Sequence, residues 1–368
     1  MNNKKFSELI NTENKKKLIK ILINESAESR VEIAKELNVS TASISKISEA
    51  LINNDLIEEV GSIDQGKIGR KQIKLQIKSN QFLSIGIEVH SNYITFIVVD
   101  LNKNILESKS IQFEKLEQEH IDILIDNLKD IKVRYNETKI LGWGLLLQGI
   151  IKNGESISLP IKDINKQIRD KVGVITFVEN NIKGLAIAEN FSKPNDVNYL
   201  FVRYGPGIGG VLSINGEVQN GLRNRAGEIG HVRYNHESKN KCPICNQYGC
   251  LESEINLNRI YKEKYNSHIT SHDQINETFI KENYNKLLEY TSILARALSQ
   301  AIDIIDPDYL LVAGKIFDNE QIFKNFVDEI NRTKEINYLD RIKKIENYSE
   351  KVKLAPALLV ISNYLNTN

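Results

Sequence analysis

Cysteine, tryptophan, methionine and proline are all scarce in this chain of 368 residues, which contains three, one, one and six of them. So few cysteines exclude a disulfide framework of the kind that holds small secreted domains together. No apolar run reaches the roughly 18 residues that a membrane-spanning helix needs. The first residues also lack the apolar core of a secretory signal. These absences, together with free thiols, predict a cytoplasmic protein with no membrane partner.

A dominant charge is absent too, because 49 basic residues nearly balance 48 acidic ones and leave a formal net charge of +1 at pH 7. Polyelectrolyte behaviour of the whole protein is therefore not implied. The hydrophobic fraction of 41% is ordinary for a soluble protein. At this length the chain suits two or three domains.

The cysteines that are present lie in one short segment, as Cys242, Cys245 and Cys250, and His231 precedes them. One imidazole and three thiolates at such spacing complete a tetrahedral shell for zinc. Four protein ligands leave no open coordination position, so the predicted zinc is structural. Two alternatives are three unrelated thiols beside a stray histidine, and a redox pair formed by Cys242 and Cys245.

The first eighty residues carry the pattern of a helix-turn-helix. Apolar residues at helical spacing predict a helix over residues 15–24. Ser29 and Glu32 form a capping box for a second helix, and Ser40 caps a third that runs to about Asn53. In such a motif the N-terminal residues of the last helix meet the base edges of DNA. The predicted DNA contacts on this helix are Thr41, Ala42, Ser43, Ser45 and Lys46.

Two strands, over residues 56–60 and 73–77, follow these helices and enclose a glycine-containing loop. Five basic residues and no acidic one lie between residues 65 and 78, as expected for the wing of a winged helix. Lys67, Arg70 and Lys71 are predicted to reach phosphates or a minor groove. Lys74 and Lys78 complete the basic wing, and Lys74 is also expected to meet a phosphate, so that its removal would flatten the salt dependence of DNA binding. The alternative is a small helical oligomerisation module with a solvated, charged loop.

Beyond residue 80 strands alternate with helices. Strands are predicted over 83–89, 93–100, 141–147 and 174–178, and a helix over 121–132. This order implies an α/β domain.

The segments 227–231 and 242–252 together resemble the signature of the ROK family of repressors and sugar kinases. The resemblance implies that His231 serves both as zinc ligand and as sugar contact, and that Glu228 and Glu252 hold sugar hydroxyls. It also implies an N-terminal winged helix-turn-helix over residues 1–80 and a two-lobed, actin-like ATPase fold of the ROK sugar-kinase type over 81–368. The first lobe would comprise about 81–181 and 352–368, and the second about 182–351.

Three parts of the family's kinase machinery are altered. The first phosphate loop lacks its glycines at residues 88–92, and Pro206 replaces a hydroxyl and removes an N–H donor in the second. Where the family places a catalytic Asp, this chain has Asn181, an amide that cannot act as a general base. Asn180 remains beside it, and both amides can still bind a sugar. The sequence therefore predicts no enzymatic activity.

These observations predict a sugar-responsive, DNA-binding transcriptional repressor of carbohydrate-metabolism genes. Its partners would be operator DNA, a small neutral sugar or sugar derivative, and a second copy of the chain in a homodimer or tetramer. The predicted sugar contacts are Asn180, Asn181, Glu228, His231 and Glu252. Two alternatives are a ROK sugar kinase with an appended helix-turn-helix, and a ligand-blind ROK regulator in which Glu228 and Glu252 only brace the zinc loop.

The other conspicuous residues predict less. The single tryptophan, Trp143, is expected in the core more than against a sugar. His90 and His120 have no evident partner in the sequence. Surface positions are expected for the histidines that show no ligand spacing, namely His236, His268 and His272.

Overall fold

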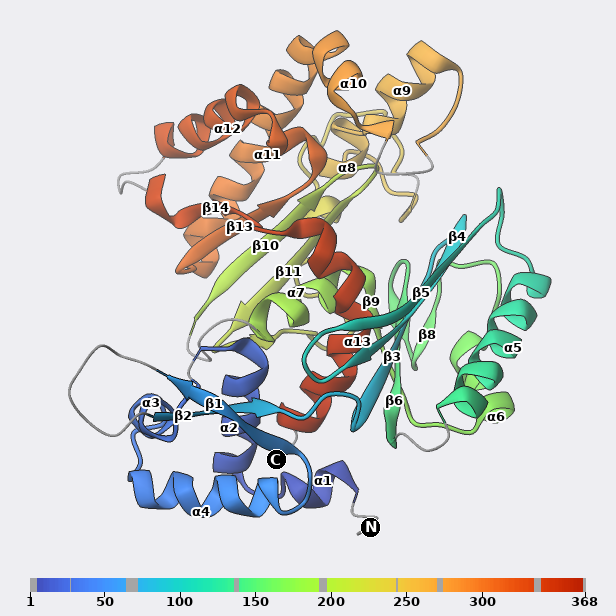
Figure 1. The fold of residues 1–368 in the computed structure, drawn as a ribbon. Coiled ribbons are helices and arrows are strands. Elements are labelled where there is room, and N and C mark those ends of the chain that lie inside the picture. The colour runs from blue at the N-terminus through green and yellow to red at the C-terminus, as the bar shows by residue number, and fades with distance from the viewer. Residues whose placement is uncertain are drawn as a thin grey trace. The chain divides into compact units, whose positions relative to one another are not determined.

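The computed structural model describes residues 5–26, 28–63, 72–135, 139–191, 197–242, 244–269, 274–333 and 339–366. The chain divides into two compact units, of which the first comprises Met1–Ser192 and Lys351–Asn368 and the second Lys193–Glu350. Figure 1 colours the chain from its N-terminus to its C-terminus. No helix among the described residues is long and apolar enough to cross a membrane.

Among its described residues, the N-terminal part of unit 1 contains four helices and a two-stranded antiparallel sheet. Ser29 and Glu32 form the predicted capping box, and the Ser40 hydroxyl accepts a hydrogen bond from the Ser43 backbone N–H. The helix-turn-helix is therefore confirmed, and it consists of the third and fourth helices. The elements are α1 (Phe6–Leu9), α2 (Glu13–Asn24), α3 (Arg30–Glu36), α4 (Thr41–Ile52), β1 (Ile57–Ile63) and β2 (Gln72–Ile77).

The rest of unit 1 is built on a five-stranded mixed sheet in the order β5-β4-β3-β6-β9. Its first three strands in sequence pair antiparallel, β6 pairs in parallel with β3, and β9 pairs in parallel with β6. The strands are β3 (Phe82–Val89), β4 (Tyr93–Asp100), β5 (Ile105–Gln112), β6 (Lys139–Leu147) and β9 (Thr176–Asn180). A small hairpin follows β6, formed by β7 (Ile151–Lys152) and β8 (Glu155–Ser156).

Helices cover both faces of this sheet. On one face α5 (Gln118–Arg134) and α6 (Ile164–Val172) share a core with the inward residues of β3, and the fully buried Trp143 belongs to this core. The core position expected for the tryptophan is thus confirmed. On the other face lie α7 (Asn181–Phe191) and the C-terminal helix α13 (Tyr348–Asn366) (Figure 1).

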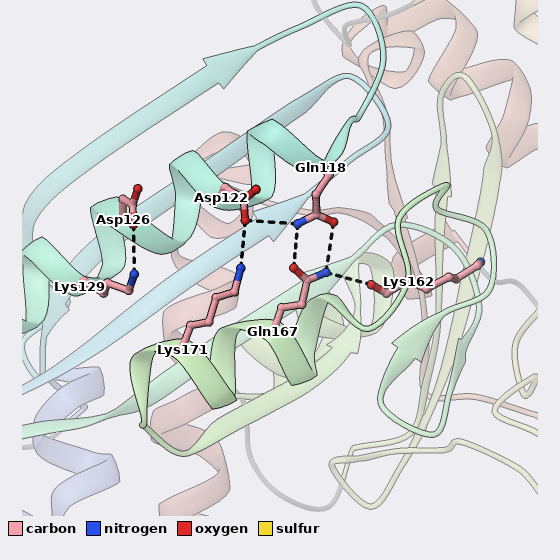
Figure 2. Close-up of polar contacts among 7 residues, drawn as sticks. All are labelled: Gln118, Asp122, Asp126, Lys129, Lys162, Gln167 and Lys171. Atoms are coloured by element: carbon pink, nitrogen blue, oxygen red, sulfur yellow. Dashed lines mark hydrogen bonds and ion pairs between the residues drawn. The ribbon is translucent and has the colours of Figure 1, made fainter.

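A polar network joins the exposed sides of α5 and α6 (Figure 2). The amides of Gln118 and Gln167 bond to each other in both directions, over 2.7 and 3.3 Å. Lys171 Nζ lies 3.0 Å from Asp122 Oδ1, and Gln167 also donates to the backbone oxygen of Lys162. Because Asp122 and Lys171 are solvent-exposed, this ion pair contributes little free energy, and the buried residues beneath it hold the helices.

Two glycines let α13 approach the sheet closely. A Cβ on Gly144 would overlap the backbone oxygen of Pro356, and one on Gly86 would meet the backbone nitrogen of Ala357. Larger residues would push the helix away from β3 and β6. The helix then delivers Leu358, Ile361 and Leu365 into the core.

The same core continues into the winged helix. Phe6 of α1 packs on Phe82 with ring centroids 5.0 Å apart and on Tyr364 of α13 at 5.6 Å. The side chain of Asn24, at the end of α2, donates to the backbone oxygen of Phe191. The winged helix therefore packs on the first lobe through side chains.

Unit 2 has its own five-stranded sheet, in the order β12-β11-β10-β13-β14. A large core joins one face of this sheet to helices that follow in sequence. The strands are β10 (Tyr199–Tyr204), β11 (Ile208–Ile214), β12 (Glu217–Val218), β13 (Tyr309–Ala313) and β14 (Ile342–Lys344). The helices are α8 (Leu251–Glu254), α9 (Leu257–Tyr265), α10 (Glu277–Glu282), α11 (Tyr284–Ile305) and α12 (Glu320–Arg332).

Two sheets of this kind, each flanked by helices, form the α/β architecture that the sequence predicted. The strand predicted over 174–178 begins at Thr176 and extends to Asn180, where it pairs with Leu147. This register places Asn180 and Asn181 at the junction of β9 and α7.

Candidate functional site

His231, Cys242, Cys245 and Cys250 come together in unit 2. Their ligand atoms all lie within 4.8 Å of one another. Cys245 Sγ is 3.4 Å from Cys250 Sγ, and Cys242 Sγ is 3.6 Å from Nδ1 of His231. A tetrahedral zinc with ordinary bond lengths requires sulfur–sulfur separations of about 3.8 Å and sulfur–nitrogen separations of about 3.6 Å. The cluster therefore fits a zinc ion with four protein ligands.

Local backbone structure sets this geometry. His231 ends a 3-10 helix (Ile229–His231), and Cys250 is the residue that precedes α8. The backbone N–H of Asn246 donates a hydrogen bond to the backbone oxygen of Cys242 over 3.0 Å, which closes the turn that contains Cys245. Gly249 has a φ of +73°, and a Cβ there would overlap the Asn235 oxygen. Glycine is thus required one residue before the last cysteine.

The electrostatics of the cluster are compatible with a bound cation. Burial, and then the neighbouring thiols, raise the pKa of Cys250 to about 12. Burial also raises the pKa of Cys242 and lowers that of His231, where the nearby Arg225 adds to the effect. Three thiolates this close repel one another, whereas a divalent cation would stabilise all three and favour a neutral imidazole.

Two carboxylates adjoin the cluster. Glu228 Oε2 lies 3.7 Å from Nε2 of His231, the ring nitrogen that points away from the thiols. Glu252 is buried, and its Oε2 accepts from the Ile208 backbone N–H at 3.5 Å. Burial is the largest cause that raises the pKa of Glu252 to about 7, and Glu228 raises it further. Unit 2 thus groups three of the predicted sugar contacts, Glu228, His231 and Glu252.

The loop between β10 and β11 carries Pro206. It remains a tight turn, since the Gly205 N–H donates to the Gly207 oxygen over 3.0 Å. The Glu252 carboxylate lies so close to Gly207 that a Cβ added there would sit 3.2 Å from Oε1. Pro206 offers no N–H donor, and its own oxygen accepts from the Asn258 side chain.

Asn180, in unit 1, uses both ends of its amide for structure. Its oxygen accepts from the backbone N–H groups of Ile182 and Lys183, which caps α7. Its nitrogen donates to the Gly149 oxygen. Asn180 therefore fixes the start of α7 and the loop after β6, so it holds the neighbouring Asn181 in place.

Asn181 belongs to a buried polar group that the sequence analysis did not foresee. Its Nδ2 lies 3.0 Å from Nε2 of His90, and Oε1 of Glu88 lies 3.2 Å from the same ring nitrogen. The His90 ring stacks on Tyr93, with centroids 4.3 Å apart and an angle of 12° between the planes. The sequence offered no evident partner for His90, and the structure supplies two, Glu88 and Asn181. Its partner Asn181 is 91 residues away in the chain, so no local spacing reveals it.

The structure also supplies partners for His120. Its Nδ1 accepts from the Glu117 backbone N–H at the start of α5, and its ring stacks on Phe113. His236 and His268 are exposed, as expected, whereas His272 lies outside the described residues.

The predicted DNA-reading helix is α4. Thr41, Ala42, Ser43 and Lys46 are exposed on it, and Ser45 is half-buried with its hydroxyl bonded to the Thr41 oxygen. Of the predicted wing contacts, Lys67, Arg70 and Lys71 lie outside the described residues. Lys74 in β2 and Lys78 directly after β2 both have acidic partners, with Lys74 Nζ 2.5 Å from Glu28 and Lys78 Nζ 2.8 Å from Asp55.

The profile of the ROK family matches residues 84–347 of this sequence, which is most of the chain. This chain belongs to the ROK family. The winged helix lies before the matched region.

Relatives of this ROK protein include regulators from two bacteria. The DNA-binding transcriptional dual regulator NagC of Escherichia coli K12 is 23% identical over 320 residues, which cover 80% of this chain and 78% of NagC. The xylose repressor of Bacillus subtilis strain 168 is 24% identical over 333 residues, covering 85% and 84%.

Solved structures of both regulators and kinases share the fold. A ROK family transcriptional regulator, described as a homolog of the E. coli MLC protein, matches with a TM-score of 0.74 and 20% identity over 97% of this chain and 96% of the other. The ROK hexokinase of Thermus thermophilus matches with a TM-score of 0.62 and 19% identity, over 75% of this chain and 97% of its own. The match thus covers almost the whole hexokinase, whereas a quarter of this ROK protein lies outside the match.

Proposed function

We propose that this ROK protein is a transcriptional repressor that binds operator DNA and releases it when a small neutral sugar binds. The proposal rests on the combination of two features. A helix-turn-helix with an exposed recognition face on α4 is joined to a ROK frame that has an amide, Asn181, at the position of the family's catalytic carboxylate. The repressor names of its relatives support the same function.

The division of labour follows the sequence prediction. Residues 1–80 would bind DNA, with Lys67, Arg70 and Lys71 reaching phosphates or a minor groove beside α4. Residues 81–368 would bind the sugar, with lobes of about 81–181 plus 352–368 and about 182–351. Asn181, Glu228, His231 and Glu252 are the proposed sugar contacts. Asn180 joins them in the prediction, although both ends of its amide already make backbone hydrogen bonds.

We further propose that the metal is zinc and that its role is structural. His231, Cys242, Cys245 and Cys250 would supply all four ligands, so the ion would have no open position for a substrate. Bound there, it would fix the loop that places Glu228 and Glu252. Glu228, close to Nε2 of His231, would orient the imidazole from its outer side.

A sugar can act on DNA binding only if it binds one arrangement of the protein more tightly than another. The winged helix packs on the first lobe through Phe6, Phe82 and Tyr364, so movement of that lobe would carry the DNA-reading helix with it. In a homodimer or tetramer this would change the spacing of two recognition helices, which must match two operator half-sites.

Selection from random duplexes tests DNA binding. A dimeric repressor should enrich one sequence with two-fold symmetry, its half-sites about one or two helical turns apart. Titration of the selected duplex in the presence of hexoses, pentoses and N-acetyl amino sugars should then find a sugar that weakens binding. A pool that stays random would refute the DNA-binding function. An enriched operator with no responsive sugar would favour the ligand-blind regulator instead.

A further inference from the structure

The buried group of Glu88, His90 and Asn181 contains a conflict of hydrogen-bond roles at one atom. Nε2 of His90 faces the Asn181 amide at 3.0 Å and the Glu88 carboxylate at 3.2 Å. All three residues are buried, with exposed fractions of 7–8%. An imidazole nitrogen either donates or accepts, so both neighbours must suit the same role.

The Glu88 carboxylate determines whether Nε2 of His90 donates or accepts. An ionised carboxylate only accepts, so a lone pair on Nε2 would face another acceptor at 3.2 Å in a buried site. With a proton on Nε2, the ring donates to Glu88 and can share the same N–H with a second acceptor. Among the described residues His90 has no side-chain acceptor for a proton on its other ring nitrogen, Nδ1. The proton therefore belongs on Nε2.

We infer that Asn181 turns its amide oxygen toward His90 and presents its NH₂ group to the effector. A donor on Nε2 requires an acceptor opposite it, and the two ends of an amide exchange by rotation about the last side-chain bond. The stack of the His90 ring on Tyr93 holds the ring plane, and the backbone N–H of His90 donates to the backbone oxygen of Tyr93 over 2.8 Å, which fixes the chain beneath the ring. Glu88 and His90 are thus positioning residues for Asn181.

This inference rests on the proposed function, because it takes Asn181 as a sugar contact, and it names the chemistry that is recognised there. A carboxylate in this position accepts from a sugar hydroxyl. Asn181 held in this way donates instead, so the sugar must offer an acceptor, either the lone pair of a hydroxyl or that of an ether oxygen. The segment that lost the phosphate loop would then set effector specificity.

The protonated ring nitrogen can be observed without any ligand. Full-length protein with ¹⁵N-labelled histidine gives separate signals for protonated and unprotonated ring nitrogens, and the His90→Gln variant identifies the His90 signals by their loss. We expect Nε2 protonated. Finding Nε2 unprotonated would overturn the inference, whether or not any sugar binds.

A second experiment reads the amide directly with D-glucose, N-acetyl-D-glucosamine and their monodeoxy and monodeoxyfluoro derivatives. Fluorine keeps a weak acceptor and removes the donor, whereas deoxygenation removes both. At the hydroxyl that meets Asn181, the deoxy sugar should bind about fivefold more weakly than the parent, and the fluoro sugar should recover part of that loss. In the isosteric Asn181→Asp variant the side chain can only accept a hydrogen bond. This variant should therefore bind the fluoro derivative no more tightly than the deoxy derivative. Identical rankings in the two proteins would contradict the inference, while a complete lack of sugar binding would contradict the proposed function alone.

The positioning role of His90 has its own matched pair of variants. His90→Phe keeps a ring to stack on Tyr93 but cannot hydrogen bond, and it should weaken binding of the parent sugar about fivefold and erase the advantage of the fluoro over the deoxy derivative. His90→Gln places an N–H near the position of Nε2 and should restore both. Equal effects of the two variants would show that His90 only packs.

Discussion

The cysteine loop of unit 2 and the β3–β4 turn of unit 1 differ in which residues of the ROK pattern they contain. In the loop, His231 joins the three cysteines in one cluster, and Glu228, a proposed sugar contact, lies beside the histidine ring. In the turn, residues 88–92 have no glycine, and His90 bonds to the amide that stands in the place of the catalytic base. Under the proposed function, the cysteine loop would serve sugar recognition, whereas the β3–β4 turn lacks the glycines expected of a phosphate loop.

The largest effect should come from removing a metal ligand. Cys242→Ser should reduce the zinc content from about one ion per chain to nearly none. Because structural zinc contributes on the order of 10 kcal/mol in small domains, unit 2 should also unfold at a markedly lower denaturant concentration. Elemental analysis and denaturant titration measure the two quantities. His236→Ala, at an exposed histidine of the same loop, is the control and should keep its zinc. A metal-free wild-type protein with unchanged stability would remove the basis of the comparison.

The next effect separates sugar recognition from metal support. Glu228→Gln should weaken sugar binding about 10- to 100-fold, since a hydrogen bond to a charged group contributes about 1.5–3 kcal/mol. Operator binding without sugar should be unchanged. Calorimetry and DNA titration test the two parts, with the exposed Glu217→Gln as control. Loss of zinc together with the sugar response would mean that Glu228 only braces the loop.

A smaller effect is expected at the DNA-reading helix, which lies outside both regions. Lys46→Ala removes one exposed cation and should lower the slope of log affinity against log salt concentration by about 0.9. Lys74→Ala should change the slope less, because Glu28 already neutralises Lys74. This revises the expectation, drawn from sequence alone, that Lys74 meets phosphate. Equal changes would place Lys74 on the DNA after all.

No effect on phosphoryl transfer is expected when a carboxylate is introduced at the position of Asn181. Asn181→Asp should leave phosphoryl transfer to hexoses, pentoses and N-acetyl amino sugars at background, because Pro206 and residues 88–92 still lack the groups that hold phosphate. A coupled assay with ATP measures the turnover. Activity of the wild-type chain that disappears in Asn181→Ala would show that this is a kinase.

Features that depend on near neighbours in sequence were predictable. The capping box of Ser29 and Glu32 spans three residues, and Ser40 caps α4 through its own turn. The metal cluster also follows from sequence, because its four ligands lie within 20 residues and few other arrangements satisfy three thiols and an imidazole. Backbone turns of fixed geometry bring such residues together.

Features that depend on packing between residues far apart in the sequence could not be predicted. The strand end at Asn180 is set by pairing with Leu147, the closeness of α13 by Gly86 and Gly144, and the neutralisation of Lys74 by Glu28. The meeting of His90 with Asn181, across 91 residues, required the whole β3–β6–β9 sheet. The sequence alone thus determined the cluster of one histidine and three cysteines, the helix-turn-helix and the family. Only the tertiary structure decided which side chains face the altered base position, because parallel strands join residues whose separation in sequence carries no pattern.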